Sequence, residues 1–135
     1  MNEIQKAYVA GIIDGEGSIM LQSFHKNQLP SPCVSVASTS MELLIYLKQI
    51  ISCGIIVKKK NYNMEKHHDS YTFYVRYNNA INLLTEIEPY LIIESKKKRA
   101  KLIIEKYKTL TPRNGRYSEE QLLLKKLFYK EFINT

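Results

Sequence analysis

Two carboxylates, Asp14 and Glu16, lie among glycines at the end of an apolar segment, residues 7–13. A carboxylate beside a tightly packed helix and a strand is costly unless it is hydrogen-bonded or binds a cation. The flanking glycines, Gly15 and Gly17, permit positive φ and close backbone approach where the helix ends. These residue types and their spacing therefore point to a hydrogen-bonded brace or to a cation site.

The helix that ends at these carboxylates is expected over residues 4–14, and one of its faces has few side chains. Tyr8 and Ile12 recur at helical spacing, whereas Ala10 and Gly11 would let a second helix approach the backbone closely. The pattern predicts a helix that packs tightly against another helix.

The other elements follow from hydrophobic periodicity, turn residues and caps. Thr39 and Glu42 fit a capping box at the start of the second helix. We expect strands over 18–26, 33–38, 55–60 and 71–77 and further helices over 40–53, 79–87, 95–110 and 118–132. The order is helix, strand, strand, helix, strand, strand, helix and then two more helices, which predicts an α+β domain.

The segment Val9–Gly17, VAGIIDGEG, resembles the LAGLIDADG motif of homing endonucleases. Val9 replaces the first Leu, Gly15 an Ala and Glu16 the second Asp, and each swap keeps an apolar, small or acidic residue. The predicted order αββαββα is also the topology of that family's domain, which has a four-stranded antiparallel saddle sheet. The resemblance therefore extends over about the first 110 residues.

The resemblance implies a metal site and a homodimer. In that family two motif helices pair across a twofold axis, and this chain has one copy of the motif. Glu16, helped by the main-chain carbonyl of Gly15, would bind a divalent metal, Mg²⁺, at the foot of each helix, and Asp14 would cap or brace the turn. The dimer helix would contribute Tyr8, Ala10, Gly11, Ile12 and Asp14.

A basic cluster, residues 96–99, opens the predicted helix at 95–110. Four cations in a first helical turn repel one another and oppose the helix dipole, so an anionic neighbour is expected. The resemblance implies that a lysine here reaches the catalytic centre. Alignment leaves Lys96 and Lys98 as candidates, and we prefer Lys96.

The residue that orders the attacking water is left open. Some members of the resembled family use a glutamine at the start of the second helix, where this chain has Ser38, Thr39 or Ser40. A hydroxyl such as that of Thr39 could hold the water instead.

One face of an antiparallel sheet with helices on its other side is left uncovered, and strand alternation predicts its residues. The DNA-contact candidates on and beside this face are Gln22, Phe24, Lys26, Lys58, Lys60, Thr72, Tyr74 and Arg76. In a major groove, Gln, Arg and Lys can pair with base edges, while Thr and Phe pack on thymine methyls. For a single polar residue a solvated sheet face is the simpler interpretation, but exposed aromatics in the set favour a partner.

Composition narrows the class of partner. The 135 residues suffice for one domain, 1–135, with a core over about 4–110 and a C-terminal helical extension over 111–135. The net charge is +7, from 20 Lys and Arg against 13 Asp and Glu. A polyanion is therefore the expected partner, and double-stranded DNA is preferred to a membrane because no helix is both strongly basic and amphipathic.

Location is inferred from composition alone. No apolar run approaches the roughly 20 residues of a membrane span, and the first residues do not form a signal peptide, so secretion is not expected. Cys33 and Cys53 lack metal-ligand spacing and are expected to be free, buried thiols in a reducing compartment. Frequent Ile, Lys, Asn and Tyr without Trp fit an AT-rich coding sequence, from an organelle (mitochondrion or chloroplast) or a low-GC prokaryote.

The sequence therefore predicts a site-specific double-strand DNA endonuclease that hydrolyses phosphodiester bonds with a divalent metal, at a long near-palindromic target, in intron homing. The alternative is a protein that binds DNA or RNA without cutting, or an intron maturase with intron RNA as its partner. Retention of the acidic Glu16 and of the basic cluster favours cleavage.

Overall fold

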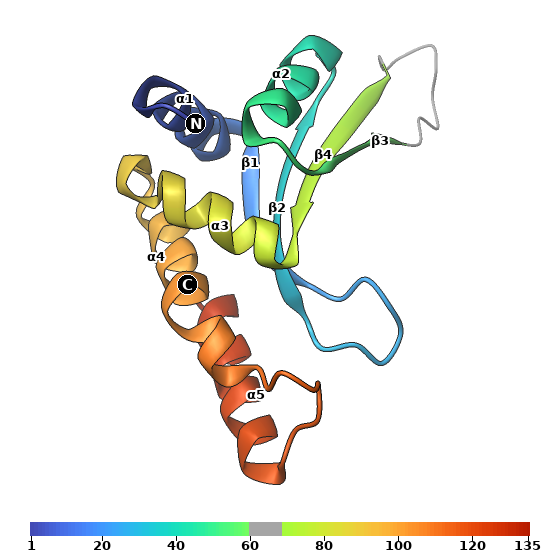
Figure 1. The fold of residues 1–135 in the computed structure, drawn as a ribbon, viewed down its shortest axis with the longest axis vertical. Helices are drawn as coiled ribbons and strands as arrows, with labels where there is room; N and C mark the ends of the chain where they lie inside the picture. The colour runs from blue at the N-terminus through green and yellow to red at the C-terminus, as the bar shows by residue number, and fades with distance from the viewer. Residues whose placement is uncertain (60–68) are drawn as a thin grey trace.

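The computed structural model describes residues 1–59 and 69–135 (Figure 1). Its elements follow the predicted order. The first seven are α1 (Glu3–Glu16), β1 (Gly17–Gln22), β2 (Ser31–Ser38), α2 (Met41–Ile51), β3 (Ile55–Lys59), β4 (Ser70–Arg76) and α3 (Tyr77–Ile87). The C-terminal ones are η1 (Glu88–Tyr90), α4 (Glu94–Leu102), η2 (Ile103–Tyr107), η3 (Lys108–Leu110) and α5 (Glu119–Ile133). The predicted αββαββα succession with C-terminal helices is confirmed.

The sheet is antiparallel, with the strand order β1-β2-β4-β3. Gly17 of β1 pairs with Val36 of β2, and Val36 pairs in turn with Phe73 of β4. On the outer side of β4, Ile56 of β3 also pairs with Phe73. These rows of paired residues fix which side chains share a face of the sheet.

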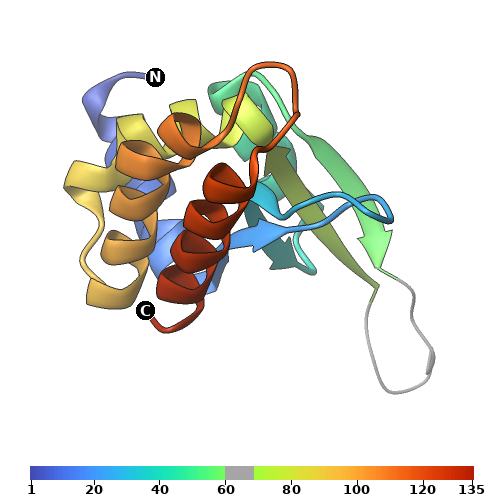
Figure 2. The ribbon, with the colours of Figure 1, turned by 90° about the horizontal axis from the view of Figure 1, so that it is seen from below.

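Helices cover one face of the sheet, as the view in Figure 2 shows with the helices to one side of the strands. The buried residues between the layers come from alternate strand positions and from helical stripes, which is the pattern expected of a two-layer α+β domain. The core includes Val9, Ile13, Ile19, Val34, Val36, Leu44, Leu47, Phe73, Val75, Leu84 and Ile87. The opposite face of the sheet is here called the open face.

Capping explains two helix boundaries and corrects a third. Asn2 caps α1 and Ser118 caps α5, each in a capping box with the glutamine three residues later. The box predicted for Thr39 and Glu42 is wrong. The N-cap of α2 is Ser40, whose side chain makes no cap bond. The N–H of this cap residue is accepted by the Ser38 Oγ (2.9 Å), and not by a glutamate three residues later.

In the C-terminal part of the chain, α4 packs against β1, and α5 carries a buried lysine. Lys125 of α5 is only 4% exposed. Its ammonium donates to the Thr111 hydroxyl and lies 3.7 Å from the ring centre of Tyr107. Burial lowers the pKa of Lys125 from 10.5 to about 8.

Both cysteines are free, as predicted. Cys33 is buried in the central strand β2, where it pairs with Arg76 of β4. Burial raises the pKa of its thiol to about 11, and the nearby Arg76 charge opposes this shift. Cys53 is half-buried after α2, and burial also raises the pKa of its thiol. No helix in the described part of the chain has the length and apolar character that a membrane span needs.

Candidate nuclease centre and nucleic-acid interface

The end of α1 packs directly onto the start of β1 because residue 17 has no side chain. A Cβ on Gly17 would lie 2.7 Å from the Cα of Ile13, closer than real Cβ contacts come. The φ of Gly17 is −97°, so close approach is what requires the glycine. The expected positive φ is wrong for both glycines, since Gly15 lies inside the helix.

Asp14 connects the foot of α1 to the start of α4. Its Oδ2 accepts the backbone N–H of Ile92 (2.9 Å) and its Oδ1 that of Ile93 (3.2 Å). Ile93 is the N-cap of α4, so the carboxylate lies at the positive end of that helix dipole. Asp14, with Glu94 in the first turn, is the anionic neighbour that the basic cluster needs.

Lys96 reaches from α4 into the foot of α1. Its Nζ donates to the carbonyl oxygens of Ile13 (2.7 Å) and Asp14 (2.6 Å). The Ile13 carbonyl also accepts the N–H of Gly17, and Lys96 adds a cation at this end of α1, where the helix dipole favours positive charge. The other candidate, Lys98, is exposed on α4 and has no ion-pair or hydrogen-bond partner among the described residues. Geometry therefore places Lys96, and not Lys98, at the foot.

Glu16 is the last residue of α1, and its side chain is exposed. Across residues 1–59 and 69–135 it has no hydrogen-bond or ion-pair partner. The negative end of the helix dipole and the carbonyl oxygens of Gly15 and Glu16 lie next to it. The Glu16 carboxylate and the last carbonyls of α1 thus meet at one solvent-facing point, and the Lys96 ammonium bonds to the carbonyls of Ile13 and Asp14 rather than to Glu16.

The solvent-facing side of α1 is a stripe of short or apolar side chains, here called the α1 stripe: Ile4, Ala7, Tyr8, Gly11 and Gly15. Ile4 is 82% exposed. No atom lies within 4 Å of a Cβ built on Gly11 or Gly15. Such a surface allows close contact with another helix.

Two of the residues predicted for the dimer contact lie elsewhere. Ala10 is fully buried against the chain's own core, because it lies about 100° around the helix from Gly11. Asp14 is engaged by the start of α4. Ile12 is half-buried beside the stripe, and Tyr8 packs edge-to-face on Tyr46 of α2, with ring centres 5.7 Å apart.

The foot of α1 offers oxygen donors, but not a complete set of ligands for a metal ion. The described residues contain no group of three His, Cys, Asp or Glu side chains that could hold a metal ion. The foot of α1 offers the Glu16 carboxylate and the Gly15 carbonyl, and oxygen donors of this kind suit Mg²⁺. Because Mg²⁺ is often held by one or two carboxylates together with phosphates and waters, these donors fit a site that a second chain and a nucleic acid would complete.

Thr39 is exposed just past the end of β2. Because Gly17 pairs with Val36, the chain continues from β2 past the foot of α1 toward Thr39. The hydroxyl of Ser38 is already engaged by the Ser40 N–H. Thr39 and Ser40 are both exposed without such a bond, and Thr39 is the one that directly follows β2.

The open face contains several of the predicted DNA contacts. Thr72, Tyr74 and Arg76 of β4 lie there, since Phe73 and Val75 point into the core. The guanidinium of Arg76 lies 5.1 Å from the ring centre of Tyr74.

Gln22 ends β1 on the same side, whereas Phe24 and Lys26 lie beyond the strand, which is shorter than predicted. The Arg76 guanidinium lies over the Phe24 ring, 4.0 Å from the centre of that ring. Lys26 is exposed in the connection to β2.

The face predicted for β3 is wrong. Lys58 pairs with Tyr71, so it belongs to the helix-covered side, where it also forms an ion pair with Asp69 (3.3 Å). Lys59, with Ile55 and Val57, belongs to the open face. The sequence did not reveal the alternation in β3, because residues 55–57 are all apolar. In the structure only Ile56 of these three packs against the core. The predicted contact Lys60 lies outside the described residues.

Sequence reasoning missed Arg99 within the basic cluster. Its Nη1 donates to the carbonyl of Ile19 in β1 (3.1 Å), and its guanidinium lies 5.0 Å from the ring centre of Phe132. Arg99 thus joins α4, α5 and the edge strand β1. A run of four cations gives no sequence signal for which one turns inward.

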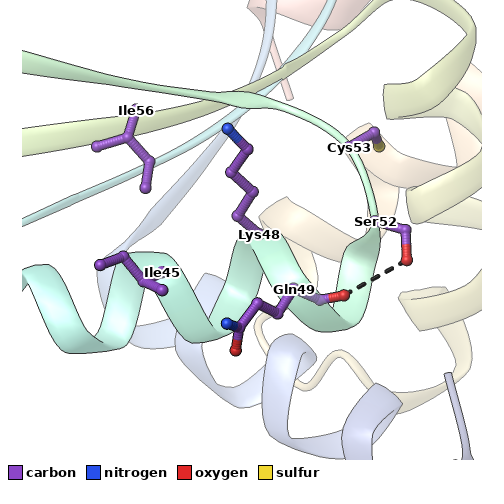
Figure 3. Close-up of a pocket in the computed structure, with 6 residues that line it drawn as sticks. All are labelled: Ile45, Lys48, Gln49, Ser52, Cys53 and Ile56. Carbon is purple, nitrogen blue, oxygen red and sulfur yellow. Dashed lines mark hydrogen bonds between the residues drawn. The ribbon is translucent and has the colours of Figure 1, made fainter.

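The hollow between α2 and β3 lies on the helix-covered side (Figure 3). Ile45, Lys48, Gln49, Ser52, Cys53 and Ile56 line it. Its described lining residues include none from the foot of α1 or the open face, and no carboxylate.

No family model matches the chain, and no curated protein is significantly similar to it in sequence. Solved structures are similar in fold. The homing endonuclease I-CvuI, in complex with a DNA target in the presence of Mg and with the DNA not cleaved, is 22% identical with a TM-score of 0.73, over 96% of this chain and 80% of that one. The archaeal intron-encoded homing endonuclease I-Vdi141I, complexed with DNA, is 16% identical with a TM-score of 0.66, over 98% of this chain and 84% of that one.

The LAGLIDADG homing endonuclease I-GzeII, in complex with its DNA target, matches 96% of this chain but only 44% of its own, at 19% identity and a TM-score of 0.69. These likenesses show that the chain has the fold of the LAGLIDADG homing endonucleases, which the motif at 9–17 implied.

Proposed function

We propose that this chain, which has the LAGLIDADG homing endonuclease fold, is a site-specific, metal-dependent DNA endonuclease that acts as a homodimer. The observation that carries the proposal is the foot of α1. There an exposed Glu16, with no partner among the described residues, and the half-buried, hydrogen-bonded Lys96 adjoin the open α1 stripe. A second copy packed on this stripe would bring two such feet together. Two apposed Glu16 carboxylates repel each other, which favours divalent cations at that point.

The proposed substrate is double-stranded DNA. The open face places Gln22, Thr72, Tyr74, Arg76 and Lys59 on one surface of a chain with net charge +7. Phosphate attraction would provide affinity, and side chains in the major groove would read bases. Twofold symmetry predicts a near-palindromic target with half-sites about one helical turn apart.

Glu16 and the Gly15 carbonyl would hold the metal, which lowers the pKa of water and neutralises charge on the scissile phosphate and the leaving 3′ oxygen. Asp14 positions α4, and Lys96 holds a fixed positive charge at the foot, where it would oppose the charge that builds on the phosphate. The Thr39 hydroxyl is proposed to hold the attacking water. Each subunit would cut one strand.

A DNA- or RNA-binding protein without cleavage, or an intron maturase, is the second candidate. The open face and the net charge would serve it equally well, but the exposed Glu16 would have no role. Intron homing and an organellar or low-GC prokaryotic origin complete the proposal and rest on the motif resemblance and on composition.

Three measurements on one purified sample test the proposal: the molar mass, the duplexes recovered from a randomised library in Ca²⁺, and cleavage of those duplexes in Mg²⁺ or in EDTA. We expect a dimer, a near-palindromic consensus and cleavage only with Mg²⁺. A monomer that selects a sequence and never cuts would favour the binding candidate, and cleavage in EDTA would contradict the metal role.

A further inference from the structure

The open face changes in chemical character from one edge to the other. At the β3 edge, Ile55 and Val57 point away from the helices and are 46% and 44% exposed. Their paired residues on β4 are Tyr74 and Thr72. Thr72 pairs in turn with Ala37 of β2, which is also exposed. These five residues form the β3 strip, which contains no charged group.

The far end of β4 differs. The Arg76 guanidinium lies between the rings of Phe24 and Tyr74, and its Nε is buried without a partner among the described residues. Gln22 ends the neighbouring part of the face. This end of the sheet therefore presents charged and amide hydrogen-bond donors. The β3 strip presents the aliphatic side chains of Ile55 and Val57 next to the hydroxyls of Thr72 and Tyr74.

We propose that the β3 strip selects thymine, with Ile55 and Val57 as the residues that determine specificity there. The inference rests on the proposed function, since it concerns how the same surface reads DNA. The C5-methyl of thymine is the apolar group that a base pair presents in the major groove. Branched aliphatic side chains can cover this methyl, and a G·C pair has no apolar group there, so the gain from burying the methyl is specific to thymine.

The position of the strip favours DNA over a protein partner. Ile55 and Val57 lie on the surface that also carries Lys59, in a chain of net charge +7. The hollow under β3 is separate, because it is lined by Ile45 and Ile56 on the helix-covered side (Figure 3). A ligand on the strip would thus contact aliphatic side chains next to a positive charge. A DNA major groove matches both, because it has thymine methyls flanked by phosphates.

The test compares two matched variants. Ile55→Thr removes apolar surface from the strip, and Ile45→Thr makes the same change on α2 at a site with 45% exposure. Binding sites are recovered in Ca²⁺ from a randomised duplex library with the unaltered protein and with each variant. In the recovered duplex, each thymine is then replaced by uracil, which lacks only the methyl group.

We expect two or more adjacent half-site positions at which uracil weakens binding by about fourfold, the value of one buried methyl. Ile55→Thr should remove the penalty at one of them, and Ile45→Thr should change neither the site nor the penalties. Indifference to uracil at every position, or penalties that survive both Ile55→Thr and Val57→Thr, would overturn the inference and leave the endonuclease standing. A change of molar mass in these variants without a change of base preference would point to a protein contact and also overturn it. If no duplex is selected at all, the proposed function fails first and the inference falls with it.

Discussion

The foot of α1 and the open face of the sheet position their side chains by different means. At the foot, Asp14 and Lys96 are held by hydrogen bonds to main-chain atoms, and Gly17 sets the distance between helix and strand. On the open face, strand alternation alone decides which residues point outward. The foot therefore has one arrangement, suited to chemistry, whereas the face tolerates substitution, suited to recognition. Changes at the foot should affect cleavage, and changes on the face should affect binding.

The largest expected effect is that of Glu16→Gln. Cleavage of the selected duplex in Mg²⁺ should fall about a thousandfold or more, since the amide holds a divalent cation poorly. Affinity for the duplex in Ca²⁺ should change by no more than a few-fold. Glu3→Gln, at the other end of α1, is the control and should cleave normally. Normal cleavage by Glu16→Gln would remove this residue from the centre.

Gly11→Leu separates dimerisation from folding. A leucine would project from the α1 stripe, where no atom lies within 4 Å, so the monomer should fold, with α1 favoured by about 1 kcal/mol from helix propensity. Close helix approach would be blocked, and light scattering should report a monomer that does not cut. A dimer of unchanged mass would place the subunit contact on another surface.

Lys125→Met tests a buried charge remote from both regions. The pKa of Lys125 is lowered to about 8 from 10.5, so between these pH values the unfolded chain binds more protons and stability rises with pH. Below pH 8 the ammonium is charged in both states and its burial cost is complete. We expect Lys125→Met to raise the free energy of unfolding at pH 7 by about 1–2 kcal/mol, by a smaller amount at pH 9.5, and to leave cleavage unchanged. Urea unfolding at the two pH values measures this, and a benefit that grows with pH would contradict it.

The smallest expected effect distinguishes two adjacent lysines. Lys59 is on the open face, and Lys58 is on the other side, paired with Asp69. Lys59→Ala should weaken DNA binding a few-fold and reduce the slope of log affinity against log salt by about 0.9, the value of one phosphate contact. Lys58→Ala should do neither. The reverse result would mean that β3 presents its other face to DNA.

The sequence predicted the foot better than the open face, for a physical reason. Two glycines and two carboxylates in that order at a helix end are an uncommon pattern, so the foot could be located from sequence. Hydrophobic periodicity and turn residues predicted the succession of elements, whereas the cap predicted for α2 was wrong. Partners distant in sequence could not be inferred, such as Asp14 with Ile92 or Arg99 with Ile19. The alternation of β3 was ambiguous because residues 55–57 are all apolar, and only the register with β4 resolves it.

The same limit applies to α1. Periodicity identified a helix with small residues, but Ala10 and Gly11 are adjacent in sequence and face opposite environments. Which of them is open depends on where the sheet packs. A helix with apolar residues around most of its circumference does not reveal this from its sequence.

The most direct test of the central claim is the position of a bound metal. Crystals of the protein with its selected duplex, grown in Mn²⁺ as an anomalous stand-in for Mg²⁺, would locate it. We predict a peak at the twofold axis or beside it, about 2.1 Å from the Glu16 carboxylate and from a DNA phosphate oxygen. A metal bound elsewhere, or the two α1 helices far apart in the complex, would contradict the claim that paired feet of α1 form the catalytic centre.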